Sequence, residues 1–277
     1  MEKFFRSICA VLAVGCFAAL SGSPARAADA SPWVEDSYSA IRLIAGAGKS
    51  GDARAGIEIK LQPGWHTYWR YPGDSGVPPR FDFAGSDNVA TAQVSFPAPH
   101  AFTDEAGTII GYKANVVLPV RIVPRQKNKP VTLRGKIDYA VCEKLCVPVE
   151  AKVELTLPPK SADNAALDAA EARVPKPVTA AQAGLSAKRT GGDKPKPQIF
   201  VDLAAPTGQP VELLVEGPTP DWALPIPKPA PGAPAGHYYF SFELDGLPPG
   251  VDPKSAVELT FTIVQGDRAT EVKTHLD

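Results

Sequence analysis

Apolar and polar residues alternate in short runs along most of the chain, which is the pattern of half-buried β-strands. In residues 151–157, AKVELTL, the apolar positions Val153, Leu155 and Leu157 fall on one face. Glycine and proline separate many of the runs, and this spacing is typical of a β-sandwich or barrel. The predicted strands of this part of the chain cover residues 41–45, 55–61, 80–83, 92–96, 115–123, 131–140 and 149–157.

The same alternation returns near the C-terminus, in the runs QIFVDL, VELLVEG, YYFSFEL, VELTFTIV and ATEVKTH. Between the second and third runs lies a proline-rich segment, residues 218–234, around Trp222. Proline cannot donate to a strand ladder, so we predict a surface loop or an edge cover there. We therefore expect an all-β chain: a β-sandwich or barrel over residues 28–158, then a second, smaller β-sandwich over residues 198–277.

A change in composition separates these two regions. Residues 159–197 are rich in proline and alanine and end in the polar run KRTGGDKP. Alanine, leucine and glutamate from Ser161 to Val174 favour a helix, and Ser161 is a suitable N-cap. We predict an interdomain linker that contains one short helix.

The N-terminus has the pattern of a secretory signal. Lys3 and Arg6 precede an apolar run that is too short to span a membrane, and small residues surround Arg26. We expect residues 1–27 to be a signal peptide, cleaved after Ala27 or one residue later. A lipobox-like reading of LAVGC, with lipid attached to Cys16, is the competing interpretation, and we expect no lipid anchor.

Removing residues 1–27 changes both the cysteine count and the charge. The segment carries Cys9 and Cys16, and its three basic residues outnumber Glu2, so the formal charge falls from −1 to −3. A mildly acidic protein does not favour nucleic acid or anionic membranes as partners. We expect a soluble periplasmic protein in which Cys142 and Cys146 are the remaining cysteines, in a compartment where disulfides persist.

The stretch DYAVCEKLCVPVE holds Cys142 and Cys146 with three residues between them. Four steps of extended strand cover about 13 Å, whereas the Cα atoms of a disulfide lie within about 7 Å. A bond between these cysteines therefore requires a tight bend at residues 143–145, between two strands. So short a loop adds only about 2 kcal/mol of stability. The residues leave three alternatives open: a redox pair, a structural disulfide, or half of a metal site.

Two other features suggest chemistry but have simpler explanations. Residues 73–76, GDSG, resemble the nucleophile motif of serine proteases, yet they follow Pro72 and read as a glycine-rich turn. The four histidines are scattered without ligand spacing. The aromatic residues of GWHTYWRYPG favour core or edge packing, with an aromatic rim around a thiol site as the alternative.

Three stretches together resemble the N-terminal periplasmic domain of the DsbD thiol:disulfide interchange proteins, and most closely the branch of the suppressor-of-copper-sensitivity membrane reductases. The resemblance covers residues 38–157, nearly half of the expected mature chain. The stretches are GWHTYWRYPGDSG, FPAPHAFTDEAGTIIGYKANVVLPV and DYAVCEKLCVPVEAKVELTL.

The resemblance implies an immunoglobulin-like fold and assigns roles to particular residues. Cys142 and Cys146 match the redox pair of the family, and residues 100–112 match the cap loop that shields that pair. Ala106 stands where the family has a cap phenylalanine, and Phe102 is the candidate substitute. The supporting residues that the resemblance points to are Tyr68, Phe102, Asp104, Glu105 and Tyr112, with Asp104 and Glu105 as modulators of the thiols.

The family implies partners as well. Its pair receives electrons from membrane and thioredoxin-like parts of the same protein, which we expect this chain to lack. The expected partners are a membrane electron donor of the DsbD or CcdA type and periplasmic thioredoxin-like oxidoreductases, with protein-disulfide reductase activity and neither cofactor nor metal. The alternative is a binding or assembly module with an inert disulfide, possibly related to copper, or Cu(I) binding by the two thiolates.

Overall fold

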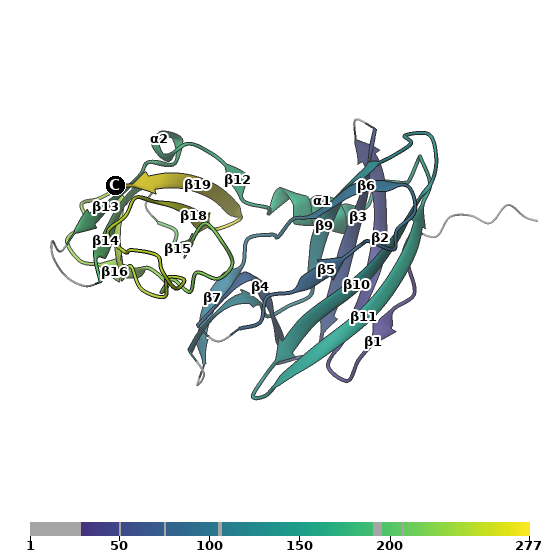
Figure 1. The fold of residues 1–277 in the computed structure, drawn as a ribbon, viewed down its shortest axis with the longest axis horizontal. Coiled ribbons are helices and arrows are strands. Elements are labelled where there is room, and N and C mark those ends of the chain that lie inside the picture. The colour runs from purple at the N-terminus through teal and green to yellow at the C-terminus, as the bar shows by residue number, and fades with distance from the viewer. Residues whose placement is uncertain (1–28, 50, 75, 105–106, 191–195, 207) are drawn as a thin grey trace, which may run out of the picture.

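The structure is a computed structural model, and it describes residues 29–277 apart from residues 50, 75, 105–106, 191–195 and 207. The expected signal peptide, including Cys9 and Cys16, lies outside the described residues. The described chain is nearly all β, as predicted, and Figure 1 shows its strands gathered into two groups that follow each other along the sequence. Neither of its two helices is both long and apolar enough to cross a membrane.

The N-terminal group is an immunoglobulin-like sandwich of two sheets. The first sheet has the order β1-β2-β3-β9-β6. Its strands are β1 (Val34–Glu35), β2 (Ser39–Lys49), β3 (Asp52–Leu61), β9 (Val116–Pro124) and β6 (Val89–Val94).

The second sheet of this sandwich carries both cysteines. Its order is β11-β10-β4-β8-β7, and the short strand β5 also pairs with β10. Its strands are β4 (His66–Gly73), β5 (Arg80–Asp82), β7 (His100–Asp104), β8 (Gly107–Tyr112), β10 (Val131–Cys142) and β11 (Cys146–Leu157).

Alternating side chains from both sheets fill the core between them. In β11 every second residue from Val149 to Leu157 is buried, which matches the predicted face. Trp69, Ile57 and Leu133 are fully buried in the same core. Burial of this apolar surface on one face of each strand fixes the register of the sheets, since a slip of one residue would turn that face to solvent.

The predicted strands of the first sandwich overlap the observed ones, but the sequence analysis left out four strands: β1, β4, β7 and β8. β4 lies in the aromatic stretch, where rings at successive positions hide the alternation. β7 and β8 form a hairpin in the segment predicted as a cap loop. Of the GDSG segment, Gly73 ends β4 and Asp74 follows at a bend, while Ser75 lies outside the described residues. The Asp74 carboxylate accepts a hydrogen bond from the backbone N–H of Thr108 at 2.9 Å.

The predicted linker differs from the structure in two ways. Its helix is α1 (Ala165–Ala172), which begins after the N-cap Asn164 and not after Ser161. The Asn164 side chain accepts from the backbone N–H groups of Ala166 and Leu167, a better cap than the serine three residues earlier. Arg54 of β3 is paired with Asp168 at 2.6 Å, and this ion pair helps to dock α1 on the first sandwich.

The rest of the predicted linker pairs with the C-terminal strands. It contains β12 (Lys176–Pro177), α2 (Ala180–Ala183) and β13 (Leu185–Thr190). β12 lies parallel to β19, and β13 is antiparallel to β14. We therefore propose that the second domain begins near Lys176, about twenty residues before the predicted boundary at Gln198.

The C-terminal group is a second, smaller sandwich of two four-stranded sheets, in the orders β12-β19-β18-β15 and β13-β14-β17-β16. Its core is separate and includes Trp222, Phe240 and Phe261. The strands not yet given are β14 (Gln198–Ala204), β15 (Val211–Glu216), β16 (Lys228–Ala230), β17 (His237–Glu243), β18 (Val257–Gln265) and β19 (Arg268–Leu276).

Gly111 tests the close pairing of β4 with β8. A Cβ at this position would lie 2.1 Å from the backbone oxygen of Thr67. Because the backbone cannot yield without breaking the ladder, we expect Gly111→Ala to lower the free energy of unfolding by about 3 kcal/mol, measured by urea denaturation. The control is Gly85→Ala, where a Cβ meets nothing within 4 Å. Equal stability of the two variants would contradict this packing.

Candidate functional site

The cysteines lie at the apex of the β10–β11 hairpin. These strands pair without a register shift from Val131 opposite Leu157 to Cys142 opposite Cys146. Residues 143–145 make the turn, as predicted, and bring the two cysteine Cα atoms to 4.2 Å. The two sulfurs are joined as a disulfide. The hairpin therefore brings the pair together by backbone pairing alone.

The two cysteines differ in exposure. Cys142 is 2% exposed and packs in a small cluster with Tyr68, Ile109 and Ala140. Cys146 is exposed, and the preceding Leu145 is 73% exposed. An attacking group from solvent thus meets the Cys146 side of the bond first, and the sequence alone did not rank the two.

Tyr68 contacts both sulfurs. Its hydroxyl lies 2.9 Å from Cys142 Sγ and 3.3 Å from Cys146 Sγ. A disulfide has no S–H, so the phenol donates. The contact follows from β4, whose His66 lies opposite Cys142 in the ladder. A donor at this distance stabilises a sulfur that takes up negative charge, as the leaving sulfur does in disulfide exchange.

Phe102 covers the same cluster from β7. Its ring packs against the Cys142 cluster and meets the His66 ring edge to face, with centroids 5.1 Å apart. The Lys113 ammonium lies over its other side, 4.1 Å from the ring centroid. Phe102 therefore packs on the cluster that contains Cys142, and its role as substitute for the family's cap phenylalanine stays a prediction.

The segment predicted as the cap loop is a hairpin, and part of it lies outside the described residues. β7 and β8 pair from His100 opposite Gly111 to Asp104 opposite Gly107. Gly107 has a φ of 131°, which glycine adopts readily. Glu105 and Ala106 are not among the described residues, and only the backbone of Asp104 is. Their predicted role as modulators of the thiols stays a prediction.

Tyr112 does not lie beside the cysteines. Its ring belongs to the main core of the sandwich, and its hydroxyl donates to the backbone oxygen of Pro97 at 2.8 Å. Burial raises the pKa of this phenol well above its usual value, so it stays neutral. Gly111, the preceding residue, is the one that faces Tyr68 across the ladder. The structure therefore places Tyr112 in the main core and not in the cysteine cluster.

Sequence reasoning missed His66 as a site residue. His66 is 4% exposed and meets the ring of Tyr68 edge to face, with centroids 5.5 Å apart. In a strand, residues two apart share a face, so Tyr68 and His66 belong together once β4 is recognised. The i, i+2 spacing of His66 and Tyr68 was therefore the signal in the sequence that could have identified His66 as a site residue.

The rim of the site is aromatic and apolar. The Tyr38 ring stacks on Trp65 with centroids 3.8 Å apart, and Trp65 precedes His66. The Tyr68 ring also packs closely on the backbone of Gly76, next to the exposed Val77. Of the described large hydrophobic residues, the exposed ones are Tyr38, Val77 and Leu145, and each adjoins a residue of the cysteine cluster or its rim.

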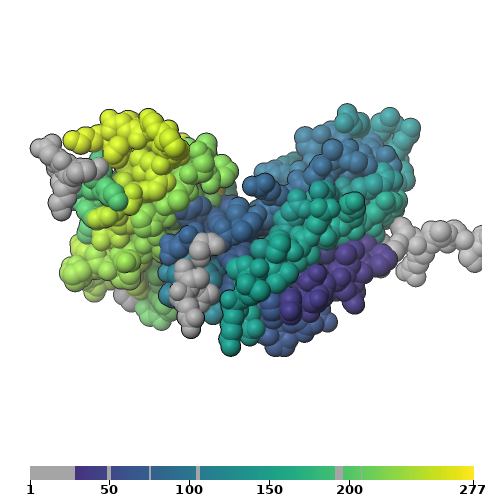
Figure 2. Space-filling model, turned by 60° about the horizontal axis from the view of Figure 1, so that its bottom comes forward, coloured from purple at the N-terminus to yellow at the C-terminus, as the bar shows by residue number. Residues whose placement is uncertain are grey.

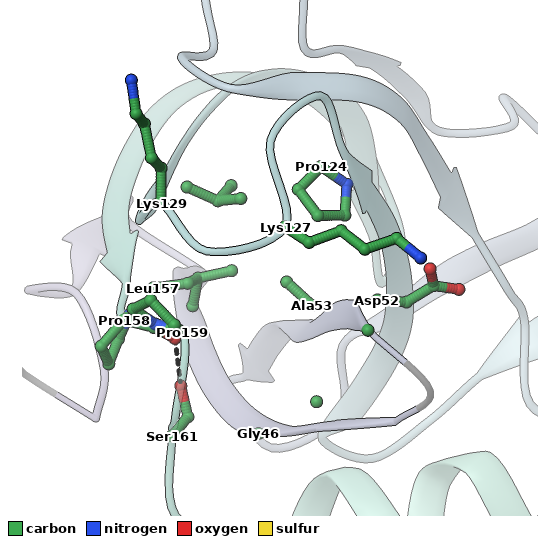
Figure 3. Close-up of a pocket in the computed structure, with 13 residues that line it drawn as sticks. Gly46, Asp52, Ala53, Pro124, Lys127, Lys129, Leu157, Pro158, Pro159 and Ser161 are labelled. Atoms are coloured by element: carbon green, nitrogen blue, oxygen red, sulfur yellow. Dashed lines mark hydrogen bonds between the residues drawn. The ribbon is translucent and has the colours of Figure 1, made fainter.

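No metal site accompanies the cysteines: within the described ranges, His, Cys, Asp and Glu nowhere gather in groups of three that could hold an ion. Figure 3 shows a pocket that is lined by residues including Lys127, Lys129 and Asp52. Its volume is about 110 Å³. It also includes Val131 and Leu157, which form the opposite end of the β10–β11 hairpin. It is therefore remote from the disulfide.

The fold and the site together define a class: an immunoglobulin-like sandwich that carries a cysteine pair at a sheet edge beneath an aromatic cover. Residues 36–158 match the family model described as "Thiol:disulfide interchange protein DsbD, N-terminal". The first sandwich is therefore a DsbD N-terminal-like domain. No curated protein matches the chain in sequence.

Among solved structures, the chain is similar to the N-terminal periplasmic domain of ScsB from Proteus mirabilis. The TM-score is 0.69 at 20% identity, over 90% of this chain and 98% of that one. This likeness concerns the fold, and it extends over both sandwiches. A conserved domain protein from Bacillus anthracis also aligns, at 9% identity over 90% of this chain and 89% of that one, but the TM-score is only 0.23.

The hydroxyl of Tyr68 gives a direct test of the site. Tyr68→Phe removes the donor to the leaving sulfur, so we expect dithiothreitol to reduce the disulfide about tenfold more slowly. The measurement is the loss of the disulfide with time, followed by quenched alkylation. The control is Tyr38→Phe, which removes a hydroxyl from the stacked pair at the rim. An unchanged rate in Tyr68→Phe would show that the phenol does not assist the sulfur.

Proposed function

We propose that the protein is a periplasmic thiol–disulfide exchange protein that passes reducing equivalents through Cys142 and Cys146 to thioredoxin-like partners. The observation that carries this proposal is the asymmetry of the pair. One sulfur belongs to an exposed residue at a hairpin apex, and the other is buried against a phenol. An exposed disulfide of this kind suits exchange better than an inert structural bridge.

The proposed reaction is balanced in atoms and electrons. In the reduced protein, the Cys146 thiolate attacks one sulfur of a partner disulfide, and the other partner sulfur leaves as a thiolate. The Cys142 thiolate then attacks Cys146 Sγ within the mixed disulfide. The Cys142–Cys146 bond forms and the partner leaves as a dithiol, so two electrons pass to the partner. By the same two steps in reverse, a reduced donor protein reduces the Cys142–Cys146 disulfide again.

Cys146 takes the attacking role because it is the accessible residue, and Cys142 resolves the intermediate from its buried position. Tyr68 assists both steps in this proposal, since its hydroxyl lies within hydrogen-bond distance of either sulfur. The phenol would stabilise a Cys142 thiolate when Cys146 is engaged with a partner.

The exposed apolar side chains at the rim favour a protein as the partner. Tyr38, Val77 and Leu145 expose apolar surface around the cysteine end of the sandwich. Apolar side chains that stay in solvent next to a reactive group favour contact with another protein over a small polar substrate. Thioredoxin-like oxidoreductases fit this requirement, and a membrane electron donor of the DsbD type would reduce the pair.

The periplasm is the proposed location. The likeness to a periplasmic domain, the predicted signal peptide and the disulfide all agree with an oxidising compartment outside the cytoplasm.

Trapping with single-cysteine variants tests the proposed function. Cys142→Ser leaves the exposed Cys146, so we expect it to accumulate a mixed disulfide with an oxidised thioredoxin-like protein. Cys146→Ser leaves the buried Cys142, and we expect at least tenfold less of that complex. The measurement is non-reducing electrophoresis of purified protein, started at Ala28, with the partner in its disulfide form.

The control is the double variant, in which both cysteines are serine, together with an established periplasmic oxidoreductase as a positive reference. Equal trapping by both single variants would contradict the roles assigned to the two cysteines. The exchange function itself would be contradicted if neither variant trapped the partner while the reference did.

A further inference from the structure

Strand β15 of the second sandwich uses its two faces differently. Leu213 and Val215 lie in the core of their own sandwich. The alternate residues, Glu212, Leu214 and Glu216, contact the first sandwich instead. The run VELLVE is therefore a strand buried on one side in its own domain and laid on the other side against its neighbour.

Glu212 holds the cap hairpin. Its carboxylate accepts a hydrogen bond from the backbone N–H of Ala101 at 3.0 Å, and it lies 3.2 Å from Nδ1 of His100. Both residues are in β7. Phe102, the next residue, is the one that packs over the Cys142 cluster.

Glu216 holds the strand that carries Tyr68. Arg70 of β4 donates to both oxygens of Glu216, at 2.7 and 2.9 Å, and to Glu271 of β19 at 2.5 Å. Burial disfavours the guanidinium, but the hydrogen bonds and charges of the two glutamates outweigh it and raise the pKa of Arg70. Arg70 lies two residues after Tyr68, on the same face of the strand's pleat.

A packed apolar contact lies between the two charged ones. Leu214 is 1% exposed and belongs to the main core of the first sandwich. Beside it, the Tyr71 hydroxyl donates to the backbone oxygen of Leu224 at 2.7 Å. Figure 2 shows the blue strands of the first sandwich lying against the green atoms of the second, below a notch between the two lobes. The contact is therefore a packed interface and not a single tether.

The strand ladder connects these contacts to the disulfide. Cys142 lies opposite His66 in β4, Tyr68 lies opposite Gly111 in β8, and Gly111 lies opposite His100 in β7. Because paired strands hold each other at fixed spacing, a movement of β7 moves Phe102 relative to the Cys142 cluster. The second sandwich thus contacts two strands of this sheet, β7 through Glu212 and the central strand β4 through Glu216.

We propose that Glu212 is a positioning residue that holds Phe102 over the disulfide, so that the second sandwich sets how readily the pair reacts. This inference rests on the proposed exchange function for its biological meaning. It gives the second sandwich a role in the chemistry of the first: Glu212 keeps the cover closed, and release of β7 from β15 opens it.

The test compares the rate at which dithiothreitol reduces the disulfide in the full chain. In Glu212→Ala the β7 backbone loses its acceptor, and we expect reduction about fivefold to tenfold faster. Glu212→Gln keeps a neutral acceptor for Ala101 N–H, so we expect a smaller increase. Deuterium uptake at residues 100–104 should rise in Glu212→Ala, while uptake in β18 stays as in the wild type.

The matched control is Glu258→Ala. Glu258 is also a glutamate of the sheet that contains β15, and it pairs with Lys273 of its own sandwich. Its loss should leave the reduction rate unchanged. If Glu212→Ala does not fold, the reduction rate is compared between Glu212→Gln and the wild type. An unchanged rate in a folded Glu212 variant, or an equal increase in Glu258→Ala, overturns the proposal.

The outcome is separable from that of the proposed function, because a small thiol needs no partner protein. A faster reduction in Glu212→Ala with no partner trapping would support the positioning role and contradict exchange. Partner trapping with an unchanged reduction rate would support exchange and contradict the positioning role.

Discussion

The uninterrupted pairing of β10 with β11 is the constraint on which the site depends. Twelve residue pairs run in register from Val131 opposite Leu157 to the two cysteines, and the turn falls where the ladder ends. The buried face of β11 fixes that register, because a slip would expose Val149, Ala151 and the apolar residues beyond them. Backbone pairing therefore places the two sulfurs together at the apex of the hairpin.

The same ladder makes the two cysteines unequal. β4 lies beside β10 and brings Tyr68 and His66 over Cys142, whereas the turn leaves Cys146 at the edge. Phe102 closes the cluster from β7, and Glu212 of the second sandwich holds the backbone beside it. Local pairing places the disulfide, and contacts between residues far apart in sequence surround it.

Much of this could be predicted from the sequence, for identifiable reasons. Regular alternation in β11 and β14 showed the strands, and the spacing of Cys142 and Cys146 required a bend. The sequence analysis missed β4 because residues on both of its faces are buried, so the large rings of Tyr68, Trp69 and Tyr71 do not alternate regularly with polar residues. The sequence analysis also missed the contact of β15 with the first sandwich. VELLVE has the pattern of an ordinary strand, and nothing in it shows that Leu214 enters a different core from Leu213. Contacts between domains leave no local pattern.

The midpoint reduction potential of the Cys142–Cys146 couple tests the central claim most directly. It would be measured on the purified protein by equilibration in glutathione or dithiothreitol buffers, with alkylation to count free thiols. A disulfide that exchanges with thioredoxin-like proteins should have a potential above about −300 mV, in the range of roughly −120 to −270 mV of such proteins. A value well below about −300 mV would mark a permanent structural bridge and contradict the account.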